Sequence, residues 1–455
     1  MARYFGTDGV RATINTGPMT AENIVRLALA AGRYFMSQQQ GSARQRPLVV
    51  IGKDTRLSGY MVEAALQAGF ASIGMDTRLL GPLPTPAVAH LTRTLRADLG
   101  VMISASHNPH HDNGIKLFGP DGYKLPDHVE DTIAGNMGEH IPLAAPQDLG
   151  RARRMLDGLG RYVEQVKTAI PRKLRLGGLK VVVDCANGAA YRAAPDVLFE
   201  LGAEVIPMAV DPDGFNINQN CGAVHPMTMA EAVVAHQADV GLSLDGDADR
   251  LIMADEKGNL INGDQCLAVI ANQMMTRGLL KGDQVIGTLM TNHGLGQYLA
   301  ERKIGLMRTQ VGDRYILDAL RQQKCNLGGE PSGHILMTDF ATSGDGLMTG
   351  LVMLSALVES EKKASESLQC FTETPQVLVN IKAEDQDQMT RAMADQTVTS
   401  AIAEAEAELG HDGRVVIRPS GTEPLLRIMV EAINDKTMQK WADTLKEVLE
   451  KALQA

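Results

Sequence analysis

A strand, a turn of small or polar residues and a helical segment follow one another three times along this chain. The copies begin at LVVIGKDTR (48–56), KVVVDCANGAA (180–190) and QVIGTLMTNHG (284–294). Strands that alternate with helices form parallel or mixed sheets covered by helices. The roughly even recurrence therefore predicts three related α/β domains. Because the copies share a pattern more than residue identity, the sequence suggests a duplication without establishing one.

The pattern changes after the polar run ESEKKASESLQ at 359–369. A strand at 376–383, a helical stretch at 388–409, two strands at 413–421 and 425–433 and a closing helix from about Asp435 are then expected. This order is typical of a small α+β domain. The closing helix carries an apolar face that we expect to pack in a core, formed by Met438, Trp441, Leu445, Leu449 and Leu453.

We therefore expect four domains. An α/β domain at 1–152 is followed by similar domains at 153–254 and 255–368, and an α+β domain occupies 369–455. The 455 residues exceed what one hydrophobic core usually organises. A composition of 44% hydrophobic and 22% charged residues is typical of soluble globular domains.

Charge and targeting features narrow the function further. The net charge of -10 argues against nonspecific binding to nucleic acid or to an anionic membrane, so an anionic ligand needs a local positive site. The N-terminal residues lack the layout of a signal peptide, and the longest apolar stretch, 346–358, is too short to span a bilayer and is expected to be a buried helix.

The cysteines favour a reducing compartment. They are odd in number, scattered and without a C-x-x-C pair, which favours neither a disulfide framework nor a zinc knuckle. We therefore expect a cytoplasmic protein. The five residues are Cys185, Cys221, Cys266, Cys325 and Cys370.

The segment GVMISASHNPHHDNGIK (100–116) places Ser106 after an expected buried strand at Leu99–Ile103. Open α/β sheets bind ligands beyond the carboxyl ends of their strands. We expect an exposed Ser106 hydroxyl on a turn stiffened by Asn108-Pro109. The G-x-S-x-G elbow of serine acyl hydrolases is missing, which disfavours acyl transfer. From the local residues alone, a serine that only caps the next element stays an alternative.

The segment VGLSLDGDADRLIMAD (240–255) ends a strand in Asp245, Asp247 and Asp249. Alternate residues of an extended loop point the same way, so three carboxylates converge and favour a hard divalent cation such as Mg²⁺. An EF-hand is disfavoured because its sixth position, where glycine is required, is Arg250. A solvated acidic turn is the remaining alternative.

Two further loops carry binding chemistry. In RPSGTEPLLR (418–427), Gly421 between two hydroxyl residues allows an anion nest, with Arg418 and Arg427 supplying charge. No G-x-x-x-x-G-K-[ST] loop occurs in the chain, and a plain β-turn at 418–427 is the alternative. In GGEPSGHI (328–335), donors and acceptors for sugar hydroxyls alternate at Glu330, Ser332 and His334, although a lone loop histidine is more often structural.

Taken together, the serine, the three carboxylates, the sugar-type loop and the phosphate clamp fall in order, one in each expected domain. This set closely resembles the α-D-phosphohexomutase family over essentially the whole chain. Within the family, YFGTDGVRA, SASHNP, DGDADR and RPSGTEPLLRIMVEA are most similar to bacterial members that isomerise glucosamine phosphates. Pro331 departs from the glutamine expected there, which concerns sugar recognition and not the reaction.

The resemblance implies a four-domain molecule with a central cleft and a phosphoserine at Ser106. One Mg²⁺ is held by Asp245, Asp247, Asp249 and an oxygen of the Ser106 phosphate. The reaction is an isomerisation of glucosamine 6-phosphate to glucosamine 1-phosphate through a glucosamine 1,6-bisphosphate, which also serves as activator. Its product feeds the synthesis of UDP-N-acetylglucosamine and cell-wall precursors.

Other residues take roles in that scheme. Arg250 spreads charge at the transferred group. Lys116 is the expected proton carrier, with His334 and Arg11 in support. Glu330, Ser332 and His334 bind the sugar. A clamp holds the non-reacting phosphate, and it consists of Arg418, Ser420, Gly421, Thr422 and Arg427.

Alternatives remain open at this stage. The same chemistry on glucose or mannose phosphates is the nearest one, followed by a metal-dependent sugar phosphatase and by a non-catalytic sugar-phosphate sensor. The expected partner is a small sugar phosphate, with neither nucleic acid nor membrane. The sequence leaves the oligomeric state open, with a homodimer as one option.

Overall fold

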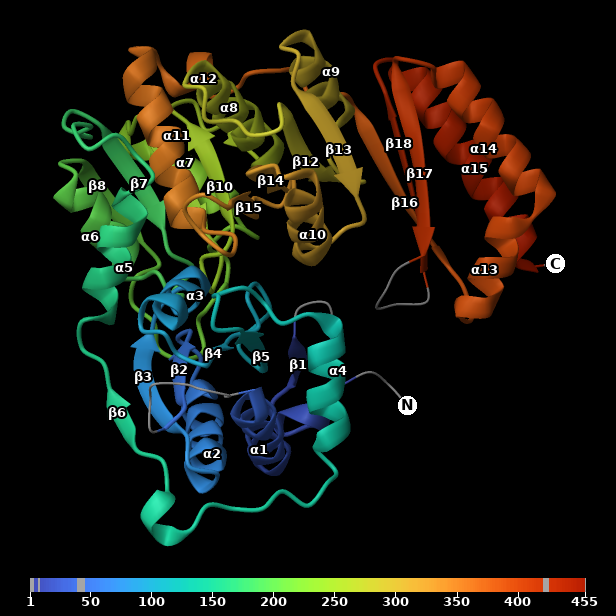
Figure 1. Ribbon diagram of the computed structural model, residues 1–455. Coiled ribbons are helices and arrows are strands. Elements are labelled where there is room, and N and C mark those ends of the chain that lie inside the picture. The colour runs from blue at the N-terminus through green and yellow to red at the C-terminus, as the bar shows by residue number, and fades with distance from the viewer. Residues whose placement is uncertain (1–3, 7–8, 39–45, 420–424, 455) are drawn as a thin grey trace. The chain divides into compact units, whose positions relative to one another are not determined.

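The computed structural model describes residues 4–6, 9–38, 46–419 and 425–454 (Figure 1). The chain forms a larger compact unit of residues 1–288 and 309–370 and a smaller one of residues 289–308 and 371–455. Mixed sheets with helices fill the larger unit, and an antiparallel sheet with helices fills the smaller one. The fold class expected from the sequence is confirmed.

The first sheet of the larger unit has six strands in the order β1-β5-β4-β2-β3-β6. Strands β2, β3, β4 and β6 run parallel, whereas β1 and β5 are antiparallel to their neighbours. The strands are β1 Val10–Thr13, β2 Leu48–Lys53, β3 Asp76–Pro82, β4 Leu99–Ile103, β5 Asp112–Phe118 and β6 Ala152–Arg154. The helices are α1 Ala21–Gln38, α2 Gly59–Ser72, α3 Thr85–Thr94 and α4 Asp127–Asn136, with short 3₁₀ turns at Gly17–Met19 and Pro146–Asp148.

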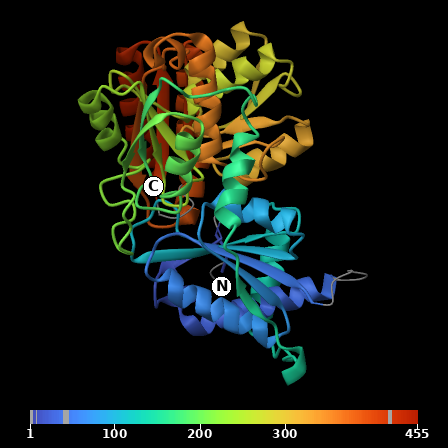
Figure 2. The same cartoon turned by 90° about the vertical axis from the view of Figure 1, so that its left-hand side faces the viewer.

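Helices bury both faces of this sheet. Apolar side chains of α1, α2 and α4 pack in one core with β2 and β4. Figure 2 shows the blue N-terminal helices lying along one side of this sheet. On the opposite face, α3 packs so closely on β2 that a Cβ at Gly52 would lie 2.4 Å from a methyl of Val88. Every residue of β2 and β4 is buried, which explains why both strands read as continuous apolar runs.

The second sheet has the order β11-β10-β9-β7-β8. Strand β7 is parallel to β8 and β9, and β10 is antiparallel to β9, so β9 and β10 form a hairpin. The strands are β7 Lys180–Asp184, β8 Glu204–Met208, β9 Val240–Leu244, β10 Leu251–Asp255 and β11 Leu260–Ile261. The helices are α5 Gly158–Lys167, α6 Ala193–Glu200 and α7 Met227–His236.

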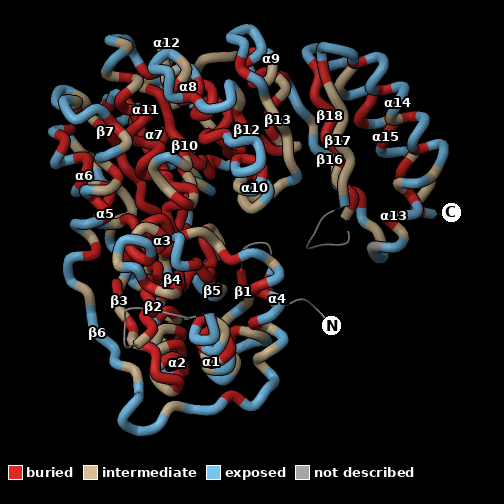
Figure 3. Tube along the Cα trace, in the orientation of Figure 1, coloured by how far each residue is buried: buried red, intermediate tan, exposed pale blue. Residues whose placement is uncertain are grey.

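The third sheet contributes β12, β14 and β15 to the larger unit. Strands β12 and β14 are parallel, and β14 forms an antiparallel hairpin with β15. The strands are β12 Gln284–Thr288, β14 Leu327–Gly329 and β15 Ile335–Met337. The helices are α8 Gly263–Thr276, α10 Asp313–Gln323, α11 Gly346–Ser360 and α12 Ala364–Ser367. Helix α11 is buried over most of its length, as expected for the apolar stretch at 346–358 (Figure 3).

The smaller unit is built on an antiparallel sheet in the order β16-β18-β17. The face of α15 expected from the sequence packs in its core, with Trp441, Leu445, Leu449 and Leu453 buried and Met438 half-buried. The strands are β16 Gln376–Lys382, β17 Gly413–Pro419 and β18 Leu425–Ala432. The helices are α13 Gln386–Ala394, α14 Gln396–Leu409 and α15 Asp435–Gln454, and the stretch before Thr309 adds α9 His293–Glu301 and β13 Gly305–Thr309.

The helical stretch expected near 388–409 is present, but it consists of two helices, because the chain interrupts it at Asp395. This residue is extended (φ -61°, ψ 136°), and its carboxylate accepts hydrogen bonds from the amides of Thr397 and Val398. These bonds lower the pKa of the Asp395 carboxyl. Asp395 therefore begins a new helix as its N-cap. The residues on both sides of it have helical patterns, so the sequence did not predict this boundary.

Helix α11 begins at a buried carboxylate. Asp345 is 2% exposed and accepts hydrogen bonds from the Met348 amide and the Tyr162 hydroxyl, both at 2.9 Å. Burial raises the pKa of the Asp345 carboxyl to about 7, although these hydrogen bonds oppose the shift. The folded protein therefore holds a proton there that the unfolded chain releases at lower pH.

The natural chain should lose stability as the pH rises through the pKa of Asp345, and the Asp345→Asn variant should not. Since the folded-state pKa is raised, the contribution of Asp345 to stability is fully present below about pH 4 and is lost as the pH rises toward about 7. Asparagine caps a helix equally well and keeps the acceptor. Urea titrations at a series of pH values measure the unfolding midpoint of each protein. The midpoint of the variant minus that of the natural chain should rise from about pH 4 to about pH 7 and stay constant above that. Parallel pH profiles of the two proteins would contradict this assignment.

Within the described ranges, no helix combines the length and the apolar character needed to cross a membrane.

Candidate active site

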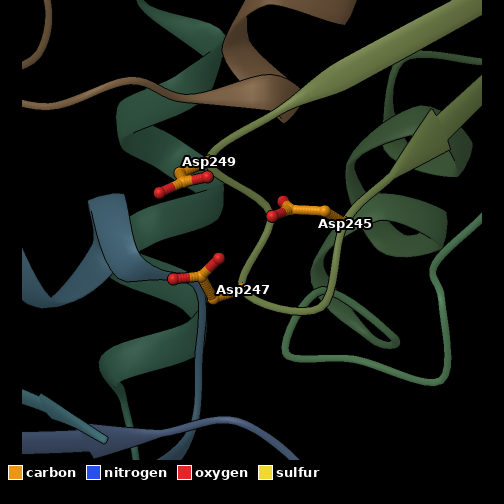
Figure 4. Close-up of side chains that lie close together, drawn as sticks. All are labelled: Asp245, Asp247 and Asp249. Atoms are coloured by element: carbon orange, nitrogen blue, oxygen red, sulfur yellow. The ribbon is translucent and has the colours of Figure 1, made fainter. Parts of the chain in front are cut away.

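The three aspartates lie in the loop that joins β9 to β10. Leu244 and Leu251 pair across the hairpin, so the loop between them is tight. Ligand oxygens of Asp245, Asp247 and Asp249 all lie within 4.8 Å of one another, and Figure 4 shows the carboxylates turned toward a shared space. The convergence predicted from their alternate spacing is present.

Burial makes this cluster electrostatically costly. Asp245 and Asp247 are 0% exposed and Asp249 is 5% exposed. Burial, together with the neighbouring charges of Asp249 and Asp247, raises the pKa of Asp245 to about 8. For Asp247 and Asp249, burial acts in the same direction, but Lys116 outweighs it for both, aided at Asp249 by His334 and Arg250, and their pKa values fall below the usual range.

Two oxygens of the cluster fit a cation. Asp247 Oδ1 and Asp249 Oδ1 are buried and accept no hydrogen bond from the described residues, although His334 Nδ1 and Arg250 Nε lie 3.7 Å and 3.9 Å from Asp249 Oδ1. A buried carboxylate oxygen without a partner is costly unless a cation compensates it. Hard oxygen donors suit Mg²⁺, which needs few protein ligands and keeps open positions for phosphate oxygens. The three aspartates could therefore hold one such ion.

Ser106 lies on the turn after β4, beside Asp245. Its hydroxyl donates to Asp245 Oδ2 at 2.5 Å and lies 3.3 Å from His107 Nδ1, while the Ser106 amide donates to Ser104 Oγ at 2.9 Å. Ser106 has φ 51°, a left-handed conformation that is uncommon for serine. The strand predicted at Leu99–Ile103 is confirmed.

The expectation of an exposed Ser106 is wrong, since the residue is only 1% exposed. The aspartate loop covers it: a Cβ at Gly246 would lie 2.5 Å from the Ser106 carbonyl oxygen. Only glycine permits this approach between two loops that are far apart in the sequence. The serine is therefore presented to the carboxylates and not to bulk solvent.

Lys116 lies on β5, opposite Met102 of β4. The lysine is 2% exposed, and its ammonium donates to Asp247 Oδ2 at 2.6 Å and to Asp249 Oδ2 at 3.1 Å. The turn thus brings Lys116 to the aspartates. As an ammonium, it neutralises part of their charge and occupies one oxygen, Oδ2, of each of the two carboxylates.

Two arginines complete the surroundings of the serine. Arg250 follows the cluster, with its Nε 3.9 Å from Asp249 Oδ1. Arg11 lies on β1, opposite Gly114. Burial, followed by the charges of Arg250 and Arg11, lowers the pKa of His107 to about 4. The structure therefore brings both arginines near the imidazole that adjoins Ser106.

The hairpin between β14 and β15 carries the expected sugar loop. The Glu330 amide donates to the His334 carbonyl, and Glu330 Oε1 accepts a hydrogen bond from the Gly312 amide at 3.1 Å. His334 Nδ1 lies 3.7 Å from Asp249 Oδ1 and its Nε2 lies 4.0 Å from Asp313 Oδ2. These carboxylates outweigh burial and raise the pKa of His334. Glu330 and His334 are buried, while Ser332 is exposed.

The expected phosphate clamp lies in the smaller unit. Arg418 on β17 and Arg427 on β18 are directly opposite in the register, and both are half-buried. The two arginines expected in the clamp are therefore neighbours across the sheet. Ser420, Gly421 and Thr422 lie outside the described residues.

Sequence reasoning missed a threonine that holds Asp247. Thr85 at the start of α3 donates its hydroxyl to Asp247 Oδ2 at 2.5 Å, and its amide donates to the Asp247 carbonyl at 3.0 Å. Together with Lys116 it occupies Oδ2 and leaves Oδ1 without a hydrogen bond from the described residues. Its only signal in the sequence was its place beyond the end of β3.

Thr85→Val should weaken metal binding while the fold stays intact. The change keeps the side-chain volume but removes the hydroxyl that orients Asp247, and loss of such a supporting bond typically costs about 10- to 100-fold in metal affinity or activity. The concentration of Mg²⁺ for half-maximal activity measures it. Thr92→Val is the matched control, because Thr92 is buried in the same helix and donates to the Val88 carbonyl. Equal metal requirements in the two variants would contradict the role of Thr85.

Comparison with known proteins places this arrangement in a family. Models of phosphoglucomutase/phosphomannomutase match the chain in four stretches: alpha/beta/alpha domain I at residues 2–141, domain II at 160–258, domain III at 262–374 and the C-terminal domain at 378–448. The chain belongs to the phosphoglucomutase/phosphomannomutase family. The family resemblance seen in the sequence is confirmed.

Individual relatives are similar over the full length. A phosphoglucosamine mutase of Paramagnetospirillum magneticum is 54% identical over 452 residues, covering 99% of both chains. Another, of Rhodospirillum centenum, is 56% identical over 436 residues, covering 94% of this chain and 91% of its own.

Solved structures share the fold. A phosphoglucomutase/phosphomannomutase family protein of Burkholderia thailandensis aligns with a TM-score of 0.83 at 23% identity, covering 99% of this chain and 97% of its own. An Aspergillus fumigatus N-acetylphosphoglucosamine mutase, solved with GlcNAc-6P and magnesium, aligns with a TM-score of 0.66 at 17% identity, covering 98% of this chain and 95% of its own.

Proposed function

We propose that this chain is a phosphoglucosamine mutase, an isomerase that interconverts glucosamine 6-phosphate and glucosamine 1-phosphate. The observation that carries the proposal is the 2.5 Å hydrogen bond from the Ser106 hydroxyl to Asp245, within a carboxylate cluster suited to Mg²⁺. The full-length similarity to curated phosphoglucosamine mutases supports the choice of sugar. The product would feed the synthesis of UDP-N-acetylglucosamine and cell-wall precursors.

In the proposed reaction, Ser106 carries a phosphoryl group between two sugar oxygens. Phospho-Ser106 donates it to O1 of glucosamine 6-phosphate: the bond from phosphorus to Oγ breaks, a bond to O1 forms, and the O1 proton leaves. The glucosamine 1,6-bisphosphate then turns over, and its 6-phosphate returns to Ser106. Glucosamine 1-phosphate leaves, and the enzyme is phosphorylated again. The same bisphosphate can phosphorylate a free Ser106 and so acts as an activator.

Charge neutralisation is the main requirement of this chemistry. Mg²⁺ bound by Asp245, Asp247, Asp249 and an oxygen of the Ser106 phosphate would neutralise charge on the transferred group. Arg250, beside Asp249, adds a cation that cannot be deprotonated. Thr85 and Lys116 hold Asp247 Oδ2, which would leave Oδ1 available to the ion.

Proton transfer needs a group that reaches the sugar oxygen. We assign this role to Lys116, which donates to Asp247 and Asp249 as an ammonium and can accept the O1 proton only as a neutral amine, after giving up one of its own protons. His334, between Asp249 and Asp313, and Arg11 support it by holding positive charge near the reacting oxygens.

Substrate recognition is divided between two loops. Glu330, Ser332 and His334 would hydrogen-bond the sugar hydroxyls, and the anion site at Arg418, Ser420, Gly421, Thr422 and Arg427 would hold the non-reacting phosphate in both orientations. The domain limits 1–152, 153–254, 255–368 and 369–455 assign one loop to each domain.

The same chemistry on glucose or mannose phosphates is the second candidate, since the family is described by those two activities. Turnover of glucosamine, glucose and mannose 6-phosphates at matched concentrations separates the candidates. We expect kcat/KM for the glucosamine phosphate to exceed the others on the order of tenfold or more, because a site built to hydrogen-bond one substituent rejects another. Equal or faster turnover of glucose or mannose phosphate would overturn the sugar assignment.

A further inference from the structure

Two buried side chains, Arg56 and Asn218, donate hydrogen bonds to the turn that carries Ser106. Arg56 follows β2, and its Nη2 donates to the Ser106 carbonyl at 3.2 Å and to the Asn108 carbonyl at 2.5 Å. Asn218, in the loop between β8 and α7, donates from Nδ2 to the same two carbonyls at 2.9 Å and 3.1 Å. Each carbonyl therefore accepts from two side chains that are far apart in the sequence.

Both donors are themselves fixed. Arg56 is 1% exposed, its amide donates to Asp54 Oδ1 at 3.0 Å, and its guanidinium pairs with Asp54 Oδ2. Asn218 is 6% exposed, and its backbone amide donates to the Ala186 carbonyl at 2.9 Å. The orientation of the Asn218 side chain follows from its partners, because only its NH₂ group can meet two carbonyl oxygens. Neither donor needs to reorganise to reach the turn.

These contacts bear on the strain at Ser106. A left-handed φ costs a serine free energy, and such a conformation persists only where the surroundings impose it. With the carbonyls of Ser106 and Asn108 drawn toward Arg56 and Asn218, the Ser106 hydroxyl is directed to Asp245 Oδ2. An extended Ser106 would turn its carbonyl away from both donors.

We propose that Arg56 and Asn218 are positioning residues that lock the Ser106 turn in its left-handed conformation. The proposal rests on the proposed function, in which one serine must present its phosphate to O1 and then recover a phosphate from O6. Two half-reactions at opposite ends of the sugar share one serine, so its position must not change while the sugar turns over. The lock supplies this constancy without touching the substrate.

Asn218→Ala tests the lock, with Asn216→Ala as a matched control. Asn216 is a near neighbour whose Nδ2 donates to the Asp211 carbonyl instead. We expect Asn218→Ala to lower kcat about 100-fold, as a misplaced reacting group does, with little change in KM or in the Mg²⁺ requirement. The rate at which glucose 1,6-bisphosphate phosphorylates the free enzyme in a single turnover should fall by a similar factor. The Arg56→Lys variant keeps the positive charge but loses the planar guanidinium with its several donors. It should also lower kcat with little change in KM, by a smaller factor.

Hydrogen exchange keeps the proposal testable if Asn218→Ala lowers stability. Exchange in the peptide around Ser106 should accelerate in Asn218→Ala and stay unchanged in Asn216→Ala. Provided that the natural chain is an active mutase, either of two results would overturn the lock. One is normal kcat and normal hydrogen exchange in Asn218→Ala. The other is a loss of kcat that added Mg²⁺ or substrate restores. If the natural chain isomerises no sugar phosphate, the proposed function fails first and the lock falls with it.

Discussion

Ser106→Ala should abolish isomerisation. The variant has no oxygen to carry the phosphoryl group, and removal of a covalent nucleophile typically costs on the order of 10,000-fold or more in kcat. The fold should survive, because the change removes only the Ser106 hydroxyl group and its hydrogen bond to Asp245. Formation of glucosamine 1-phosphate, together with the thermal midpoint, measures both expectations.

Ser104→Ala is the control for that experiment. Ser104 lies two residues away and is 0% exposed, and its hydroxyl oxygen accepts a hydrogen bond from the Ser106 amide. Its loss removes the neutral hydrogen bond from the Ser106 amide and the side-chain hydrogen bond to Asp54 but leaves the Ser106 hydroxyl in place, so activity should fall far less than in Ser106→Ala. Comparable activity of Ser106→Ala and the natural chain would end the phosphoserine assignment. Comparable loss in both variants would show that the turn and not the hydroxyl matters.

Asp247→Asn should raise the Mg²⁺ requirement and lower kcat. Asp247 Oδ2 is held by Thr85 and Lys116, while the buried Oδ1 accepts no hydrogen bond from the described residues. An amide cannot carry the charge that attracts the cation, and its NH₂ group must face either Lys116 or the ion. We expect the half-saturating Mg²⁺ concentration to rise about 100-fold, with a similar or larger loss of kcat.

A binding readout separates metal affinity from activity. Mg²⁺ should raise the thermal midpoint of the natural chain, because a ligand of the folded state stabilises it, and this rise should be smaller in Asp247→Asn. Asp255→Asn is the matched control: Asp255 is a buried carboxylate at the end of β10 whose Oδ1 accepts from the Lys257 and Asn259 amides. An unchanged metal titration in Asp247→Asn would remove the carboxylate from the site.

The parts of the site that follow strand ends could be predicted from the sequence. Ser106 after β4 and the three aspartates after β9 are local signals, because a buried apolar run followed by polar residues marks the edge of a sheet where ligands bind. Alternate spacing was enough to predict that the carboxylates converge. The boundaries of β16, β17 and β18 were similarly readable from their apolar patterns.

The remaining features depend on contacts between distant segments. The burial of Ser106 arises because Gly246 packs against its carbonyl, and no local pattern announces that contact. Thr85, Arg56 and Asn218 act through hydrogen bonds to residues far away in the sequence, so their spacing carries no motif. The break at Asp395 was missed for a different reason: an N-cap between two helical patterns reads as one more polar helix position.

Transfer of labelled phosphorus tests the central claim most directly. The purified protein is phosphorylated with a sugar bisphosphate carrying ³²P, freed of excess label, and mixed with unlabelled glucosamine 6-phosphate and Mg²⁺ for a single turnover. The expected result is that label leaves Ser106 and is recovered in glucosamine 1,6-bisphosphate and in the isomerised sugar phosphates. Isomerisation of the sugar with all label still on the protein would contradict the account.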